Sequence, residues 1–378
     1  MSEAEMTPEQ PRERLLYIVD WLPPDFGAIG QYALQHCVER AQAGWDVVLA
    51  GLSSEKTSEE VQQFEGGGTL RIRRLKAQAF DRNSFIKRAI WTFRTNARLL
   101  WHNRRELAWT KRVLITGSPP FLIHFMAPLN RGMGKSLTYR IADFHPECLM
   151  AGVDRVPLVL TLFHRLTLAM RKSVQHFEVL GEDQRERLIE AGIDAERIEL
   201  ERCPSPVEID PNAKPLDRPS ELKDHAVLLY SGNFGRAHDY ETFLEGYRLH
   251  HERAKQSGKR STALWLNAIG AHAAIVEERI KAMDLPLVRG QPVPLNQLAN
   301  LMVTPDAHLI TLLDEFVGYV VPSKVYACIE SGRPVLYVGS KKSDVHLLCS
   351  QDVKRYWQAE TGNAASVADA LDAIAAGQ

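Results

Sequence analysis

The sequence predicts an α/β protein built from two doubly wound, mostly parallel sheets. Short apolar runs alternate with segments of helical character along nearly all of the 378 residues, which is the pattern of parallel strands joined by helices. The alternation occurs on both sides of a proline-rich stretch, and a chain of this length can form two cores. The expected divisions are a disordered leader at 1–13, a first domain at 14–205, a linker at 206–225 and a second domain at 226–378.

The composition is that of an ordinary soluble protein, with 45% hydrophobic and 25% charged residues. Five cysteines are scattered without C-x-x-C spacing, which argues against a zinc site or a disulfide framework and favours a reducing compartment. The polar N-terminus lacks the apolar core of a signal peptide, and no run approaches the about 20 apolar residues of a spanning helix. We therefore expect a cytoplasmic protein.

The loop between the first predicted strand (15–19) and the first predicted helix holds Gly27, Ala28, Ile29 and Gly30. Two glycines at a helix entrance allow the backbone to approach a ligand closely. The spacing is not G-x-G-x-x-G, so the fingerprint of a dinucleotide site is not met. A purely structural role for the two glycines is the alternative.

A basic segment follows the polar connection expected at 53–68. Residues 71–112 contain 13 Lys and Arg against two acids, although the whole chain has a net charge of −1. Between 80 and 109, aromatic and aliphatic residues alternate with these cations at helical spacing, which is typical of a helix pair on an anionic membrane surface. An amphipathic helix with a solvated basic face is the alternative. Nucleic acid is disfavoured, because the charge is local and no nucleic-acid module follows.

The later strands of the first domain are expected at 113–116, 138–141, 176–180 and 198–201. Two of them end in polar residues: Ser118 and Pro119 follow one strand, and Asp143 and His145 follow the next. A carboxylate and an imidazole at the carboxyl end of a strand can orient or deprotonate an acceptor hydroxyl. The alternative is that Asp143 caps a turn and His145 packs before a proline.

The strands of the second domain are expected at 226–230, 262–266, 286–289, 308–313 and 335–338, with helices at 239–256, 273–283, 295–303, 324–331 and 365–375. The first strand runs into a turn with Gly232, Asn233, Gly235 and Arg236, which is a plausible cradle for a diphosphate. Gly290 ends the third strand in the same way.

The segment 307–339 is predicted to form a strand, a loop, a helix and a second strand, joined by very short connections. Pro322, Ser323, Lys324 and Val325 place a hydroxyl and a cation at the start of its helix, where free N–H groups favour anions. A phosphate or diphosphate is the expected ligand. The alternative is that Ser323 is an N-cap and Lys324 a solvated charge.

The run PSKVYACIESGRPVLYVG, with the upstream Asp314-Glu315, resembles the donor-binding segment of family 4 of the retaining nucleotide-sugar glycosyltransferases. TGSPPF and DFHPE are similar in order and separation to the first domain of its bacterial Pro-Ser-Lys subgroup. The resemblance covers nearly all of residues 14–375. It implies the GT-B architecture, in which two Rossmann-like domains face a central cleft, the second holds the nucleotide sugar and the first holds the acceptor.

The resemblance further implies transfer of a hexosyl unit with retention of configuration, to a lipid-linked or polysaccharide acceptor, without a metal or other cofactor. Lys324 and Arg236 would neutralise the leaving diphosphate. Glu315 would contact hydroxyls of the donor sugar, and Ser323 would bond a phosphate oxygen. The glycine loop after the first strand would face the acceptor and the donor phosphate. Separately, the basic segment 71–112 suggests a peripheral location on the inner face of the plasma membrane.

Three departures from the family pattern leave other functions open. Where the family has Arg, Lys and Glu, this sequence has Asn233, His238 and Ala327, and Glu330 lies one turn after the last of these. The chain also ends at Gln378, before the long terminal helix that often crosses back to the first domain. The alternatives are a non-catalytic binding or scaffold subunit and a nucleotide-sugar epimerase or hydrolase on the same architecture.

Overall fold

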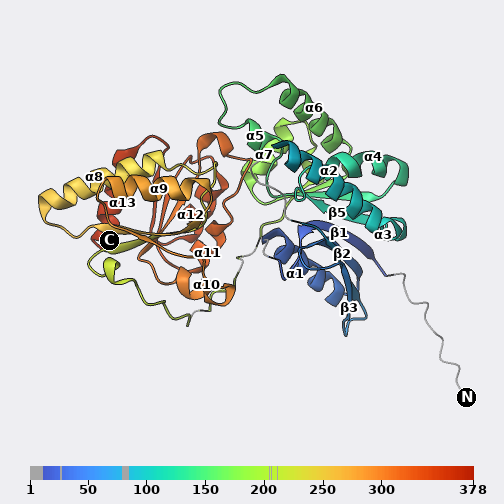
Figure 1. Ribbon diagram of the computed structural model, residues 1–378, viewed down its shortest axis with the longest axis horizontal. Coiled ribbons are helices and arrows are strands. Elements are labelled where there is room, and N and C mark those ends of the chain that lie inside the picture. Colours follow the sequence, from blue (N-terminus) through green and yellow to red (C-terminus); the bar gives the residue numbers. More distant parts are fainter. Residues whose placement is uncertain (1–11, 26–27, 79–84, 204, 206, 211) are drawn as a thin grey trace, which may run out of the picture. The chain divides into compact units, whose positions relative to one another are not determined.

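The computed structural model describes residues 12–25, 28–78, 85–203, 205, 207–210 and 212–378 (Figure 1). The chain divides into two compact units, of which the first contains Met1–Pro146, Pro157–Val179 and Ala191–Glu199. The second contains Glu147–Val156, Leu180–Glu190 and Leu200–Gln378. Most of the predicted leader, Gly27 of the glycine loop and three prolines of the linker region lie outside the described residues.

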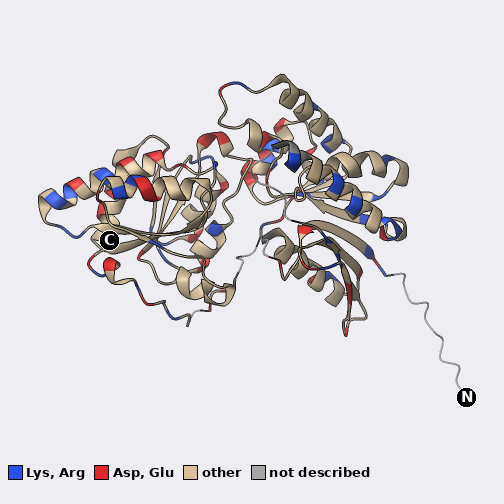
Figure 2. Ribbon diagram, in the orientation of Figure 1, with Lys and Arg blue, Asp and Glu red and all other residues tan. Residues whose placement is uncertain are grey.

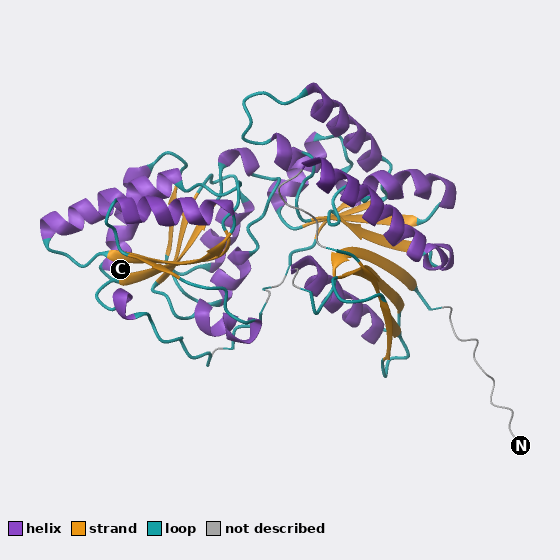
Figure 3. Ribbon diagram, viewed as in Figure 1, coloured by secondary structure: helices purple, strands orange, loops and turns teal. Residues whose placement is uncertain are grey.

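The first unit is built on an eight-stranded sheet (Figure 3). Its strands are β1 (Arg14–Trp21), β2 (Asp46–Ser53), β3 (Ser58–Gln63), β4 (Thr69–Lys76), β5 (Arg112–Thr116), β6 (Ser136–Ile141), β7 (His176–Val179) and β8 (Ile198–Leu200). Their order across the sheet is β3-β4-β2-β1-β5-β6-β7-β8. The pairs from β4 to β7 are parallel, and β3 is antiparallel to β4.

The sequence predicted no strand at β4, whose residues fall at the start of the basic segment, and the surface connection expected at 53–68 was wrong because that stretch contains strand β3. Its residues are nearly all polar, so it lacks the apolar run of a buried strand. It is held by its backbone pairing and by ion pairs to β4, including Glu59 to Arg73 at 3.1 Å and Glu60 to Arg74 at 3.3 Å.

Helices cover both faces of this sheet. They are α1 (Ala28–Gln42), α2 (Phe85–His102), α3 (Arg104–Trp109), α4 (Ile123–Met133) and α6 (Leu158–Lys172). Figure 1 shows α1 on one side of the sheet and α2, α4 and α6 on the other. That division follows from right-handed crossovers, because the chain moves outward in one direction from β1 to β2 and in the other from β5 to β7. The helix pair expected between 80 and 109 is present as α2 and α3.

The second unit is built on a six-stranded sheet whose pairs are all parallel. Its strands are β9 (Ala226–Asn233), β10 (Thr262–Ile269), β11 (Leu287–Arg289), β12 (Ala307–Thr311), β13 (Val335–Val338) and β14 (Tyr356–Ala359), in the order β11-β10-β9-β12-β13-β14. The helices are α5 (Glu147–Met150), α7 (Glu182–Glu190), α8 (Glu241–Ser257), α9 (Ala271–Ala282), α10 (Leu295–Met302), α11 (Lys324–Glu330), α12 (Asp344–Asp352) and α13 (Ala364–Ala375).

Alternation along β9 supplies a core on each face of this sheet. Leu228 and Tyr230 join the cluster beneath α8 and α13, whereas Val227 and Leu229 join the cluster beneath α10. Burial of each such aliphatic side chain contributes about 1.5–3 kcal/mol. Both faces of β9 are therefore apolar, and its polar residues are confined to its carboxyl end.

Each sheet has a point where the chain reverses the direction in which it adds strands. In the second unit this switch point lies between β9 and β12, and in the first it lies between β1 and β5. Ligands of open α/β sheets bind beyond the carboxyl ends of the strands at such points. The fold alone therefore marks two edges at which to look for a site.

Candidate functional site

At the switch point of the second unit, hydrogen bonds connect the loops that follow β9 and β12. The N–H of Leu313 donates to the carbonyl of Ala237 at 2.8 Å, and Nδ1 of His238 lies 2.6 Å from the carbonyl oxygen of Thr311. The polar residues that the sequence placed in these two loops are therefore held beside one another.

Lys324, the first residue of α11, brings a buried cation to this place. Its Nζ lies 3.3 Å from the ring centroid of Tyr230 on β9. In the described part of the chain this nitrogen is buried and has no hydrogen-bond partner. Burial lowers the pKa of Lys324 from 10.5 to about 7. A buried ammonium without a counter-ion marks a site for an anion that comes from outside the chain.

The glycines around Lys324 keep the edge open. Gly232 has φ +118°, a conformation suited to glycine, and a Cβ there would lie 3.6 Å from Cε of Lys324. Gly270 has φ +106°, and a Cβ there would lie 2.3 Å from Oδ1 of Asn233. A side chain at Gly270 would therefore displace Asn233, whereas a Cβ at Gly232 would be in ordinary contact with Lys324 and is disfavoured by the backbone conformation.

His238 occupies the position where the family pattern has a lysine, and it is not a cation. It is buried, and burial followed by the nearby charge of Lys324 lowers its pKa to about 3. Because the Thr311 carbonyl can only accept, the Nδ1 of His238 carries the proton of the neutral ring. The positive charge at this point comes from Lys324.

Three other predicted residues present exposed polar groups near this edge. Arg236, Glu315 and Ser323 are exposed, and among the described residues neither the guanidinium nor the carboxylate has an ion-pair partner. The neighbouring Asp314, by contrast, accepts a hydrogen bond from Thr361 at 3.0 Å. Ser323 makes no side-chain cap bond to α11, so its interpretation as a simple N-cap was wrong.

Some predicted residues lie elsewhere or are already engaged. Val325 is buried and its N–H donates to the carbonyl of Pro322 at 3.0 Å, so it presents no group to a ligand. Glu330 ends the seven-residue helix α11, about 9 Å along the axis from Lys324. Gly290 packs against β10, where a Cβ would lie 2.8 Å from Nε1 of Trp265.

Asp183, near the start of α7, fixes the loop that leads to Lys324. Its Oδ2 accepts from the N–H of Gly318 at 3.3 Å and from that of Asp344 at 3.0 Å. Asp344 in turn forms an ion pair with Arg202. Burial raises the pKa of Asp183 to about 6. This contact was not predicted, because it joins positions more than 130 residues apart.

The switch point of the first unit carries a residue that sequence reasoning missed. Asp20, at the carboxyl end of β1, accepts a hydrogen bond from Oγ of Ser118 at 2.5 Å across this point. Its other oxygen, Oδ1, is buried and has no partner among the described residues. Burial raises the pKa of Asp20. The available signal was an acid placed directly after an apolar strand.

The other predicted residues of the first unit lie at the same edge. Asp143 follows β6 with its side chain exposed, and the ring of His145 lies 6.3 Å from that of Phe121. Pro119 is buried. Gly30 has a packing reason, because a Cβ there would lie 1.9 Å from the carbonyl oxygen of Trp21. Ile29 packs against the core of β1 and α1.

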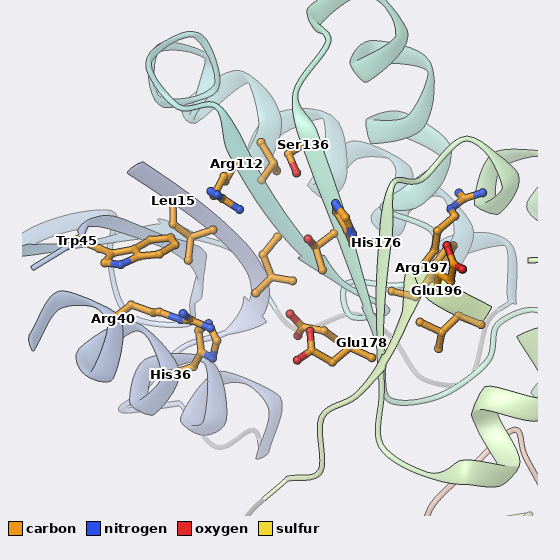
Figure 4. Close-up of a pocket in the computed structure, with 16 residues that line it drawn as sticks. Leu15, His36, Arg40, Trp45, Arg112, Ser136, His176, Glu178, Glu196 and Arg197 are labelled. Carbon is orange, nitrogen blue, oxygen red and sulfur yellow. The ribbon is translucent and has the colours of Figure 1, made fainter. Parts of the chain in front are cut away.

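The opposite, amino-terminal edge of the first sheet holds a cavity of about 480 Å³ (Figure 4). Its lining includes the first residues of β5, β6 and β7, namely Arg112, Ser136 and His176. Charges of both signs line it, and Arg40 and Arg112 both stack on Trp45. It lies at the wrong ends of the strands for the ligand site of such a sheet.

Two further observations concern the whole chain. Among the described residues, no helix is long and apolar enough to cross a membrane. All five cysteines lie in the described part, where none forms a disulfide.

No protein-family model matches the chain, and no curated protein matches it. Solved structures of glycosyltransferases do. A trehalose-6-phosphate synthase from E. coli bound with UDP-2-fluoro glucose has a TM-score of 0.65 and 12% identity, covering 96% of this chain and 91% of that one. The synthase from Burkholderia multivorans has a TM-score of 0.61 and 11% identity, covering 96% and 88%.

The lipopolysaccharide outer core galactosyltransferase WaaB has a TM-score of 0.53 and 12% identity, covering 96% of this chain and 90% of that one. At such identities the likeness establishes architecture only. It extends over nearly the whole length of all four chains, and both sheets are doubly wound and mostly parallel, as the sequence predicted. The protein has the GT-B fold of two Rossmann-like α/β domains.

Proposed function

We propose that this protein is a glycosyltransferase that moves a hexosyl unit from a nucleotide-diphosphate sugar to an acceptor with retention of configuration. The observation that carries the proposal is the buried, unpaired ammonium of Lys324 at the switch point of the second sheet. A diphosphate supplies the negative charge that this ammonium lacks. The sequence resemblance to family 4 points to the same donor class.

The named structural neighbours support the donor and the stereochemistry. One is bound with UDP-2-fluoro glucose, and one trehalose-6-phosphate synthase structure is described in terms of glycosyl transfer with retention. The latter has a TM-score of 0.61 and 14% identity, covering 96% of this chain and 91% of that one. We carry both properties to this chain as part of the proposal.

In the proposed reaction, the bond between the anomeric carbon and the diphosphate oxygen breaks as the acceptor oxygen bonds to the same face of the sugar. Lys324 and Arg236 stabilise the negative charge that develops on the leaving diphosphate, and the reaction needs no metal on this account. Ser323 bonds a phosphate oxygen and Glu315 holds hydroxyls of the donor sugar. Asp143 or His145 orients the acceptor hydroxyl and accepts its proton as the new bond forms.

We further propose a lipid-linked or polysaccharide acceptor, for which the likeness to a lipopolysaccharide galactosyltransferase is the support. A lipid-linked acceptor goes with a cytoplasmic protein that associates peripherally with an anionic membrane, which the sequence assigns to residues 71–112.

A non-catalytic binding subunit is the second candidate. It is favoured by His238, which is neutral where the family has a cation, and by Ala327, which is buried where the family has a glutamate. An epimerase or hydrolase would convert the donor without any acceptor. These functions differ in what they do to a bound donor, so binding and turnover must be measured separately.

The first test is a calorimetric titration of the protein with UDP, GDP, dTDP and their sugar conjugates. We expect one nucleotide to bind, and we expect Lys324→Ala to abolish that binding. Lys342→Ala is the matched control, because Lys342 is an exposed lysine of the same unit. Binding to none of these nucleotides would overturn the proposal. Binding without turnover, tested with a panel of acceptors, would leave the non-catalytic function.

A further inference from the structure

Helices α2, α4 and α6 form one continuous layer on the first unit. Phe93 of α2 packs on Phe125 of α4 with ring centroids 5.1 Å apart, and His124 of α4 stacks on Phe163 of α6 at 4.6 Å. The inner side of the layer is buried against the sheet, through residues such as Leu99 of α2. Its outer side is called here the α2–α4–α6 face.

The α2–α4–α6 face carries an unusual amount of exposed apolar surface. Of the 14 large apolar side chains that are most exposed in the described part of the chain, eight belong to these three helices: Ile90, Phe93, Trp101, Leu129, Leu158, Val159, Leu162 and Leu166. Trp101 is 70% exposed and Leu158 is 73% exposed. Contiguous apolar surface of this kind on a monomer marks an interaction site.

The spacing of these side chains shows that they form stripes. On α6, Leu158, Leu162 and Leu166 follow one another at intervals of four residues, so they lie along one side of the helix. On α2, Ile90 and Trp101 lie on the side opposite the buried residues, and Phe93 lies on the flank that packs against Phe125 of α4. The outward sides of α2 and α6 are therefore apolar, although their buried sides are partly polar, with Thr95 and Asn96 on α2 and Thr167 and Arg171 on α6.

The charges on the same helices are all positive. The sequences of α2, α4 and α6 contain no Asp or Glu. Their exposed cations are Lys87, Arg94, Arg98, Arg131, Arg165 and Lys172. Figure 2 shows blue segments and no red ones along α2. Exposed aromatic and aliphatic residues among cations, without acids, are the pattern of a surface that lies on an anionic bilayer.

We infer that the α2–α4–α6 face docks on an anionic lipid bilayer, with its apolar side chains in the interface and its cations among the headgroups. This surface differs from the basic segment 71–112 assigned from sequence. Arginines 71, 73 and 74 of β4 are neutralised by carboxylates of β3 and α3, whereas α4 and α6 lie outside that segment. A second copy of the chain is a poorer occupant, because two faces of this kind would oppose like charges.

The test is co-sedimentation with vesicles of phosphatidylglycerol and phosphatidylcholine, with vesicles of phosphatidylcholine alone as the lipid control. We expect binding to the anionic vesicles at 50 mM salt and release at 0.5 M salt, because the Debye length shrinks from about 14 Å to about 4 Å. The measurement needs no nucleotide or sugar, so its failure would be distinct from a failure of the proposed transferase activity.

Two sets of variants separate the apolar and charged contributions. Phe93→Ser with Trp101→Ser, and separately Leu158→Ser with Leu162→Ser, remove apolar side chains from different helices and should each weaken binding at least tenfold. Lys87→Gln, Arg94→Gln and Arg98→Gln together should weaken binding to anionic vesicles about 100-fold, at about fivefold per charge. Val61→Ser and Ile269→Ser are matched controls, since both residues are exposed apolar side chains outside the face.

The outcomes are decisive in either direction. The inference stands if both apolar variants lose vesicle binding while the two controls retain it and all variants keep the circular dichroism spectrum of the parent. It fails if the parent does not bind anionic vesicles at low salt, or if the α6 variant binds as the parent does. It also fails if the parent forms dimers that the same variants disrupt, which would assign the face to a second copy.

Discussion

The ammonium of Lys324 lies 3.3 Å from the centroid of the Tyr230 ring, although the two residues are 94 positions apart. The contact joins α11, the helix that follows β12, to β9, and β9 and β12 are the two strands that border the switch point. The ring face attracts the cation, but it does not replace a counter-ion. The site therefore holds a positive charge that is only partly compensated until a ligand arrives.

Proton uptake on binding follows from the pKa of Lys324, which burial lowers to about 7 in the empty protein. A bound diphosphate favours the charged form and raises this pKa. At pH 8 the empty site is mostly neutral, so binding should take up close to one proton, whereas at pH 6 it should take up almost none. Titration calorimetry in buffers of different ionisation enthalpy measures this number. An equal uptake at both pH values would contradict the assignment.

Lys324→Met should stabilise the empty protein. The folded state lowers the pKa of this lysine below its value in the unfolded chain, so between pH 7 and 10.5 the unfolded state holds more protons. The penalty is therefore complete below pH 7 and declines as the pH rises towards 10.5. Lowering this pKa from 10.5 to about 7 corresponds to about 5 kcal/mol, of which loss of the cation–π contact offsets about 1–2 kcal/mol. We therefore expect a gain in unfolding free energy of about 3–4 kcal/mol at pH 6 and of about 1 kcal/mol or less at pH 9.

Denaturant unfolding at the two pH values measures that difference. Lys342→Met, at an exposed lysine of the same unit, should change neither value. A destabilised Lys324→Met variant would show that the lysine is better compensated than its surroundings indicate.

Asp183→Asn should destabilise the second unit by about 1–3 kcal/mol. The carboxylate accepts the N–H groups of Gly318 and Asp344 on Oδ2 and that of Gln184 on Oδ1. An amide keeps only one oxygen, so it would leave at least one of these three donors without an acceptor. Thermal unfolding measures the loss. Asp194→Asn is a suitable control, because that carboxylate is 80% exposed.

Gly270→Ala should be the more harmful of two glycine substitutions at positive φ. Gly270 and Gly258 have φ of +106° and +64°, but only at Gly270 would a Cβ meet other atoms, the nearest being Oδ1 of Asn233 at 2.3 Å. We expect Gly258→Ala to cost about 1 kcal/mol and Gly270→Ala to cost at least about 2 kcal/mol. Equal costs in thermal unfolding would mean that Asn233 moves aside freely.

The sequence predicted those parts of the protein that depend on local patterns. Most strands of both cores appear as apolar runs, and Lys324 follows a recognisable loop between β12 and α11. Strands β3, β4 and β14 were missed: β3 is held by polar residues and ion pairs instead of apolar burial, and apolar residues alternate with arginines along β4. The contacts of Asp183 and Asp20 could not be foreseen, because each joins residues that only the completed fold brings together.

The burial of Lys324 could likewise not be predicted from the sequence. A lysine that follows a proline and a serine is compatible both with an exposed cation and with a phosphate ligand. Its burial depends on Tyr230 of β9 and on the nearby Gly232, both of which are distant from it in the sequence. The local sequence pattern identified Lys324 as a candidate site residue, but its lowered pKa results from packing in the folded protein.

The membership of Leu180–Glu190 in the second unit has a consequence for protein engineering. This segment precedes the proline-rich stretch, yet its Asp183 holds the loop that leads to Lys324. A fragment that begins at the proline-rich stretch would lack this carboxylate, together with α5 and α7. A chimaera that joins two homologous chains at that point would therefore separate the loop before Lys324 from the Asp183 carboxylate that holds it. An exchange of the second unit should include α5 and α7 as well as the residues after the proline-rich stretch.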